Sequence, residues 1–188
     1  MDRVQLSTPR LELRAALPTE AALVVDYFAR NRTHLSAWEP APPPRFYEVP
    51  FWEQRLEQYG AEEAEGRNVR LHLFERRTGR VIGTVGVANI VRGAFHSAHL
   101  GFGLDERSQG SGLMREALEA VIEHAFGPMN LHRLEANHQP HNLKSAGLLR
   151  RLGFVPQGYA RDYLFIAGEW RDHVQTALLN PHWVRPPE

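Results

Sequence analysis

The stretch DERSQGSGLMREALEAVIEHAF, residues 105–126, joins a glycine-rich turn to a strongly amphipathic helix. Gly127 and Pro128 end the helix, and a strand is predicted on either side of it, at residues 97–104 and 131–137. The apolar side chains that recur at helical spacing are Leu113, Ala117, Leu118, Val121, Ile122, Ala125 and Phe126. A strand, a helix and a strand of this length form a βαβ crossover, so the two strands are expected to be parallel neighbours.

The segments before this crossover predict an antiparallel meander accompanied by two helices. Alternating apolar residues indicate strands at residues 10–16, 69–75 and 80–90. Helices are predicted over residues 19–35, with Thr19 as N-cap, and over residues 50–66. The side chains expected on their buried sides are Leu23, Tyr27 and Phe28 in the first helix, and Phe51, the stem of Arg55, Leu56 and Tyr59 in the second.

The segments after the crossover add a short helix at residues 142–154 and strands around residues 159–166 and 172–179. The predicted fold is therefore mixed α/β, antiparallel first and parallel in the middle. Residues 38–50 interrupt the pattern, because five prolines in thirteen residues block both a helix and a central strand. We expect an ordered loop or a mobile flap there.

The composition fits one globular domain spanning residues 1–188, with 43% hydrophobic and 23% charged residues. The formal net charge is zero, which argues against sequence-independent binding to nucleic acid or to an anionic membrane. The chain has no cysteine, which excludes disulfides, thiol nucleophiles and cysteine-bound metals. No stretch is typical of a signal peptide or a membrane span, so we expect a soluble, cytoplasmic protein, either a monomer or a homodimer.

The glycine turn leaves two interpretations open when its residues are taken alone. Gly110 and Gly112 can serve a simple turn, or they can let an anion approach the unpaired amides at the start of the helix. Arg107 adds a positive charge beside them. The phosphate-binding motifs of NTP hydrolases and of nicotinamide enzymes are absent from the sequence.

The spacing Arg107-x-x-Gly110-x-Gly112 resembles the Arg/Gln-x-x-Gly-x-Gly/Ala signature of GNAT acyltransferases. The segments NRTHLSAWEP, NIVRGAFHSAHLGFGL, PHNLKSAGLLRRLGF and GYARDYLFIAGEWRDHV are together similar to the Rim-type N-terminal alanine acetyltransferases. The resemblance covers nearly the whole chain. It implies a GNAT fold, with a mixed twisted sheet of about six to seven strands, flanking helices and a central βαβ site for acetyl-CoA. It also implies a protein acceptor, with the N-terminal alanine of a small-subunit ribosomal protein favoured.

The resemblance further implies which residues bind the cofactor and the acceptor. Asn142 and Ser145 match the family's Asn-x-x-Ser pattern beside the pantetheine arm, and Ser145 would stand near the thiol. The region around the acceptor groove would include Arg32, Trp38 and Glu39, with Trp38 either exposed beside the groove or packed under the proline-rich loop as part of the core. The expected cofactor-binding residues are Phe102, Gly103, Leu104, Arg107, Gln109, Gly110, Ser111, Gly112, Leu113, Met114, Asn142 and Ser145.

The chemistry requires donors for the thioester oxygen and a base for the amine. Backbone amides at the end of LGFGL are the candidate donors, with Gly101 and Gly103 keeping one face of that strand open. Glu135 is the candidate base, because it points away from its apolar neighbours. Its alternatives are a solvated partner of Arg133, or a water chain that ends at Glu135 or at a histidine. An acid that some relatives use falls at Leu164 here, which puts any single base in question.

The sequence is also compatible with two other classes of function. One keeps the chemistry and changes the acceptor to a small amine, such as a polyamine, an aminoglycoside or an amino acid. The other is a non-catalytic acetyl-CoA-binding factor for ribosome assembly. A metal site is not expected, because His138 and His141 lie three apart in a loop and lack the spacing of a ligand set.

Overall fold

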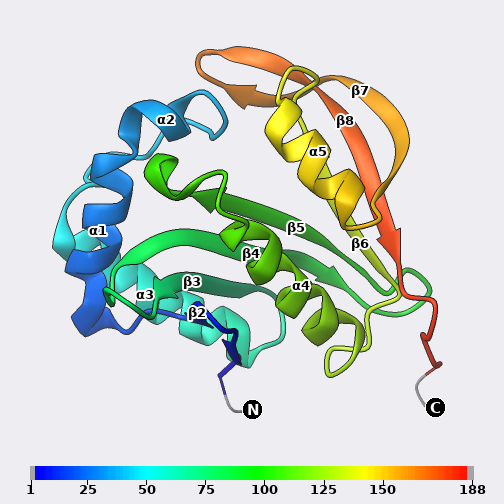
Figure 1. Ribbon diagram of the computed structural model, residues 1–188, viewed down its shortest axis with the longest axis horizontal. Helices are drawn as coiled ribbons and strands as arrows, with labels where there is room; N and C mark the ends of the chain where they lie inside the picture. Colours follow the sequence, from blue (N-terminus) through cyan, green and yellow to red (C-terminus); the bar gives the residue numbers. More distant parts are fainter. Residues whose placement is uncertain (1–2, 186–188) are drawn as a thin grey trace.

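One eight-stranded sheet forms the centre of the molecule, in the order β1-β2-β3-β4-β5-β6-β8-β7 (Figure 1). The computed structural model describes residues 3–185. β5 and β6 are parallel, and the other neighbouring strands are antiparallel. The strands are β1 Gln5–Ser7, β2 Leu11–Arg14, β3 Val69–Glu75, β4 Val81–Val91, β5 Ser97–Leu104, β6 Arg133–His138, β7 Val155–Ile166 and β8 Glu169–Leu179. The expected order of antiparallel and parallel pairing is confirmed.

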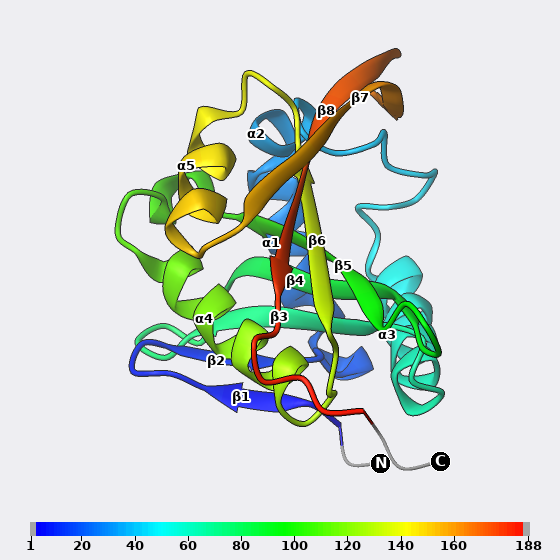
Figure 2. The same ribbon diagram turned by 90° about the vertical axis from the view of Figure 1, so that its right-hand side faces the viewer.

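The helices cover both faces of this sheet, with α4 and α5 on one side and α3 on the other (Figure 2). They are α1 Ala21–Arg30, α2 Arg32–Ser36, α3 Val49–Ala64, α4 Leu113–Phe126 and α5 Leu143–Arg151, with short 3-10 turns η1 Pro18–Glu20 and η2 Glu106–Ser108. Two hydrophobic cores result. The larger packs α4 and α5 against the sheet, and the smaller joins α1, α2 and α3 to Phe74 and Val81.

The parallel strands β5 and β6 pair over only three residues and then separate. Ser97 to His99 lie opposite Arg133 to Glu135, whereas β5 continues to Leu104 and β6 to His138. Helix α4 follows β5 after the glycine turn, and α5 follows β6. The two helix N-termini therefore lie at the ends of the separating strands, where backbone groups of β5 have no partner in β6.

The structure corrects several local expectations. The sheet has eight strands rather than six to seven, because β1 forms a short hairpin with β2. The helix predicted over residues 19–35 breaks at Asn31 into α1 and α2, and α1 starts after η1 rather than at Thr19. Leu23 is exposed, while Val24 lies in the core. In α3, Trp52 replaces Phe51 and Tyr59 as the deeply buried aromatic residue beside Leu56.

The proline-rich segment runs as a loop from Ala37 to Glu48, and its last two residues begin α3. Pro50 is accommodated in the first helical turn, where no hydrogen bond from its nitrogen is needed. None of the helices within residues 3–185 is long and apolar enough to cross a membrane.

Candidate active site

The turn between β5 and α4 has the geometry of an anion cradle. Gly110 has φ +76° and Gly112 has φ +81°, in the left-handed region that favours glycine. A Cβ at Gly110 would meet nothing within 4 Å, and one at Gly112 would meet only the Arg10 guanidinium. Gly112 is the N-cap of α4, and no side chain caps the first turn. The amides of the first turn thus remain available to a ligand.

Cationic and polar side chains surround this cradle. The Lys144 ammonium donates to Gln109 Oε1 at 2.6 Å, and Arg107 is exposed at the turn. Gln109 Nε2 lies 2.9 Å from His34 Nε2, so Gln109 bridges α5 and α2. Lys144 was not among the expected binding residues. The sequence around Lys144 did not indicate this contact, because Lys144 reaches the turn only through the packing of α5 beside it.

The remaining residues expected at the turn divide into exposed and buried groups. Ser111 is exposed, and its hydroxyl donates to the carbonyl of Ser108 at 2.6 Å. Leu113 and Met114 place their side chains in the larger core. These two residues can contribute only backbone amides to a ligand.

The free edge of β5 presents backbone groups beside the cradle. The Asp105 amide donates to the carbonyl of Ile82 at 2.7 Å, which sets the alternation of the β4–β5 ladder. By that alternation the amides of Phe102 and Leu104 point away from β4, to the side where β6 has separated. They are the donors at the end of LGFGL that can reach a ligand.

Gly101 and Gly103 lie on the same face of β5, and the surroundings of Gly103 on that face differ from the expectation. A Cβ at Gly101 would meet nothing within 4 Å, so this position is open as expected. A Cβ at Gly103 would lie 3.2 Å from Tyr27 Oη and 3.3 Å from Glu39 Oε1. The face at Gly103 is therefore lined by two polar side chains rather than open, and a Cβ there would require them to shift by a few tenths of an ångström.

Asn142 and Ser145 lie at the start of α5. Asn142 is the N-cap, and its Oδ1 accepts a hydrogen bond from the Ser145 amide at 3.1 Å. The Asn-x-x-Ser spacing is thus also that of a capped helix. The Ser145 side chain is half-buried, and within residues 3–185 no hydrogen bond engages its hydroxyl. That hydroxyl is free to interact with a ligand.

Asp105 anchors the end of β5, a role that sequence reasoning missed. Its Oδ2 accepts from Arg30 Nε at 2.5 Å and from Asn31 Nδ2 at 3.2 Å, and its Oδ1 accepts from the Arg107 amide. Burial alone raises the pKa of Asp105, but these hydrogen bonds outweigh it and the net pKa is lowered. The charged carboxylate therefore ties α1 and α2 to the loop that carries the cradle.

The residues expected to contact the acceptor lie around α2. Arg32 is exposed, with its guanidinium carbon 5.0 Å from the centre of the Tyr47 ring. Trp38 is half-buried, between the two alternatives that the sequence left open, and its ring lies 5.3 Å from that of His141. Gln139 also donates to the carbonyl of Ala37 at 3.1 Å. These contacts join the end of α2 to the loop before α5.

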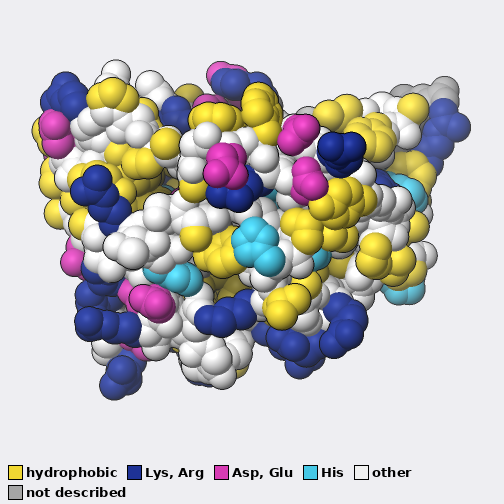
Figure 3. Space-filling model, turned by 90° about the horizontal axis from the view of Figure 1, so that it is seen from above, with side chains coloured by type: hydrophobic (Ala, Val, Ile, Leu, Met, Phe, Trp, Pro, Cys, Tyr) yellow, Lys and Arg dark blue, Asp and Glu magenta, His cyan; other side chains and the backbone are white. Residues whose placement is uncertain are grey.

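This end of the molecule combines polar and apolar side chains. The tip of the β7–β8 hairpin lies at the same end as α2 in both ribbon views (Figures 1 and 2). Seen from that end, histidine, acidic and basic side chains are interspersed with hydrophobic ones (Figure 3). Such a mixed surface suits a short peptide better than it suits a polyanion.

Glu135 points to the face of the sheet opposite α4, as its alternation predicted, and both its oxygens are engaged. Its Oε1 accepts from Arg133 Nε at 2.7 Å, and its Oε2 lies 3.2 Å from His99 Nε2. The other nitrogen of the His99 ring lies 3.1 Å from Asn89 Nδ2. The alternative that pairs Glu135 with Arg133 therefore describes its surroundings.

Glu39 is the acidic residue of this region with the clearest electrostatic perturbation. Burial raises its pKa to about 7. Within residues 3–185, its carboxylate takes part in no hydrogen bond or ion pair.

Across the same residues, no cluster of three or more histidine and acidic side chains is arranged to hold a metal ion. His138 lies buried beside the carbonyl of Gln139.

Comparison with known proteins gives this arrangement a family. Residues 10–155 match the acetyltransferase (GNAT) domain. The chain belongs to the GNAT acetyltransferase family. As an N-acetyltransferase of this family, it belongs to a group of enzymes that take the acetyl group from acetyl-CoA.

Relatives narrow the resemblance to the RimJ type of GNAT acetyltransferase. The chain is 41% identical over 181 residues to the [ribosomal protein uS5]-alanine N-acetyltransferase of Escherichia coli, covering 96% of this chain and 93% of that protein. A crystal structure of ribosomal-protein-S5-alanine acetyltransferase from Vibrio fischeri is 37% identical, with a TM-score of 0.93 over 97% of this chain and 100% of that one.

A structure of RimJ from Mycobacterium smegmatis in complex with CoA-disulfide is 28% identical, with a TM-score of 0.87. It covers 97% of this chain and 89% of that one. The GNAT fold expected from the sequence is confirmed by these likenesses. The roles of individual site residues stay predictions.

Proposed function

We propose that this GNAT enzyme transfers the acetyl group of acetyl-CoA to the N-terminal α-amine of ribosomal protein uS5, at an alanine. The observation that carries the proposal is the 41% identity to the Escherichia coli uS5-alanine acetyltransferase over nearly the full length of both chains. The likeness in three dimensions to the Vibrio fischeri enzyme, with a TM-score of 0.93, is consistent with it. The proposal places the chain in the cytoplasm, where ribosomal proteins are made.

The residues of the cradle fit the pyrophosphate of coenzyme A. Open space at Gly110, the uncapped first turn of α4 and the nearby cations Arg107 and Lys144 all favour a doubly charged group. The edge amides of Phe102 and Leu104 suit the amide-rich pantetheine arm, which would pair there like an added strand. We therefore assign the donor site to the gap between β5 and β6.

Acetyl-CoA, when bound, supplies an activated acyl group as a thioester. The chain then has to stabilise the carbonyl oxygen as it gains charge, and the amides at the free edge of β5 are its donors for this task. The hydroxyl of Ser145 is free to hydrogen-bond the sulfur as it leaves. Glu135 stays a candidate for the proton acceptor, although Arg133 and His99 occupy its carboxylate oxygens.

The acceptor approaches from the face of β5 that carries Gly101 and Gly103. Gly101 leaves that face open, and Trp38, Glu39 and Arg32 lie on the α2 side of it. The half-buried Trp38 ring offers an apolar wall for a small first residue such as alanine. The exposed Arg32 is placed to contact the backbone or an acidic side chain further along the peptide.

The test is acetylation of a peptide that copies the first residues of the host's uS5. Purified protein, acetyl-CoA and the peptide are mixed, and the product is sequenced by tandem mass spectrometry. We expect one acetyl group on the N-terminal alanine. The control is the same peptide with a blocked α-amine and intact lysines, which should stay unmodified.

Two results would contradict the proposal. Rapid acetylation of spermidine, an aminoglycoside or a free amino acid, with an inert uS5 peptide, would assign the enzyme to small amines. Binding of acetyl-CoA with no acceptor reacting would favour a non-catalytic factor in ribosome assembly.

A further inference from the structure

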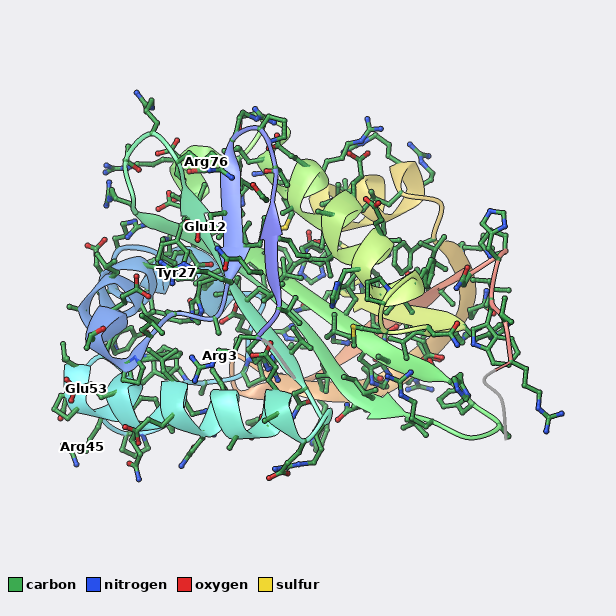
Figure 4. The ribbon with its side chains drawn as sticks, turned by 90° about the horizontal axis from the view of Figure 1, so that it is seen from below. Arg3, Glu12, Tyr27, Arg45, Glu53 and Arg76 are labelled. Carbon is green, nitrogen blue, oxygen red and sulfur yellow. The ribbon has the colours of Figure 1, made fainter. Side chains whose placement is uncertain are left out.

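The half-buried Glu39 carboxylate and the buried Tyr27 hydroxyl converge on the face of β5 that the cradle does not use. Tyr27, on α1, is fully buried between α1 and the strands of the sheet (Figure 4). Its hydroxyl makes no hydrogen bond of normal geometry within residues 3–185, although the Thr84 side chain lies close enough to lower its pKa. Glu39, which follows α2, brings Oε1 to within 3.3 Å of the point where a Gly103 Cβ would lie, and Tyr27 Oη is 3.2 Å from the same point. A partly desolvated carboxylate with no ion pair, next to a buried hydroxyl, costs stability and contributes nothing to folding in return.

The side chains that meet Glu39 beside Gly103 bring no positive charge. Tyr27 reaches the Gly103 Cβ position from α1 and Leu35 reaches it from α2. The acid that follows β5, Asp105, is paired with Arg30. Burial is the cause of the raised pKa of Glu39, at about 7. The pKa of Tyr27 is raised as well, first by burial and then by the Glu39 charge. An incoming cation would therefore find the Glu39 carboxylate uncompensated.

Glu39 differs from Glu135, the other acid near the site, in its hydrogen-bond and charge partners. Glu135 has one oxygen on Arg133 and the other on His99, so a proton from an amine would compete with two cationic or hydrogen-bonding partners. Glu39 has no such partner, and it adjoins the residue between Phe102 and Leu104, whose amides face the proposed donor site. The carboxylate and the donor site thus meet across one strand, from opposite faces.

We propose that Glu39 binds the α-ammonium group of the acceptor peptide and takes its proton, with Tyr27 as a positioning residue for the carboxylate. The proposal rests on the proposed function for the identity of the acceptor. One N–H bond of the ammonium breaks, and its proton passes to Glu39. The nitrogen lone pair then forms the new C–N bond, the C–S bond breaks, and the thiolate leaves with the electron pair. A second proton leaves the nitrogen to solvent, and the thiolate is protonated from solvent.

The experiment compares Glu39→Gln with Glu135→Gln in the full-length protein. Glutamine keeps the size of either side chain and removes its basicity. We measure kcat/KM with the uS5 peptide between pH 5.5 and 9, at saturating acetyl-CoA, together with the acetyl-CoA Kd and the Tm. The wild type should show an ionisation near pH 7, where Glu39 titrates, besides that of the α-amine near pH ~8.

Glu39→Gln should abolish the ionisation near pH 7 and lower kcat by roughly 10²–10⁴-fold, the usual range for a general base. Its acetyl-CoA Kd should stay within about twofold of wild type, because Glu39 lies on the other face from the cradle. Glu135→Gln should keep the ionisation. A wild-type profile in Glu39→Gln, or loss of the ionisation in Glu135→Gln alone, overturns the proposal. Tyr27→Phe should shift the apparent pKa of the same ionisation, and an unchanged profile removes its positioning role.

A second readout does not depend on turnover. Isothermal titration compares the uS5 peptide with a copy whose α-amine is replaced by hydrogen, at pH 8 and with coenzyme A present. Wild type should prefer the amine-bearing peptide, and Glu39→Gln should lose that preference. If Glu39→Gln fails to fold, Glu39→Asp serves in both measurements, and an unaltered preference and profile there also refute the proposal. Should the wild type ignore the uS5 peptide and acetylate another amine, the proposed function fails, and the Glu39 comparison is made with that amine.

Discussion

Replacing Gly110 by alanine tests the assignment of the cradle most cleanly. The substitution forces an alanine to adopt φ +76°, which costs about 1–2 kcal/mol. It adds no clash, because a Cβ there meets nothing within 4 Å. Gly79, in the turn between β3 and β4, is a matched control with φ +68° and equally open surroundings. The two variants should therefore lose similar stability, and their Tm values should fall by similar amounts.

Their affinities for acetyl-CoA should differ. In the proposed donor site, a methyl group at Gly110 would stand where the pyrophosphate approaches the backbone. Losing one charge-assisted hydrogen bond costs about 1.5–3 kcal/mol, which corresponds to a Kd roughly 10–150-fold higher. Isothermal titration should find this weakening in Gly110→Ala and a wild-type Kd in Gly79→Ala. Equal Kd values for the two variants would refute the placement of the phosphates.

Three further outcomes follow from individual contacts. Ser145→Ala should lower kcat by about tenfold and change the acetyl-CoA Kd far less, because in the proposed site its hydroxyl bonds the departing sulfur; an unaltered kcat in stopped-flow assays excludes that role. Asp105→Asn should reduce the free energy of unfolding at pH 7 by about 2 kcal/mol, since it breaks the charged bond to Arg30. Folding lowers the pKa of Asp105, so its carboxylate stabilises the fold at pH values above the unfolded pKa of ~4. This stabilisation is lost as the pH falls through the lower pKa of the folded state. In urea melts at such a low pH, the free energies of unfolding of Asp105→Asn and wild type should converge. Trp38→Ala should raise KM for the peptide by about tenfold, and an unchanged KM would move the alanine site away from α2.

The parts of the fold that the sequence predicted have strong local causes. Helix α4 combines glycines before it, a long apolar stripe and Gly127 after it, so its bounds and its buried face were both readable. The parallel pairing of β5 and β6 followed from the length of the crossover. Strand β1 is only three residues long and too short for an alternation to be recognised. The break at Asn31 was hidden because the helical spacing of apolar residues continues across it.

The parts of the site that could not be predicted depend on contacts between distant segments. Glu135 meets His99 because two strands pair in parallel, and nothing in the spacing of the two residues indicates this. Glu39 was expected near the acceptor from its place beside Trp38, but its burial arises where α1, α2 and β5 meet. Lys144 reaches Gln109 only because α5 docks beside the turn. Each depends on tertiary packing rather than on local pattern.

The proposed acceptor is tested in the host cell by the mass of the N-terminal peptide of uS5. The peptide is isolated from ribosomes of the parent strain, of a strain lacking this gene, and of that strain carrying the wild-type or the Glu39→Gln gene. We expect an acetylated N-terminal alanine in the parent, a free alanine in the deletion strain, and restoration by the wild-type gene alone. Full acetylation of uS5 in the deletion strain would contradict the proposed acceptor.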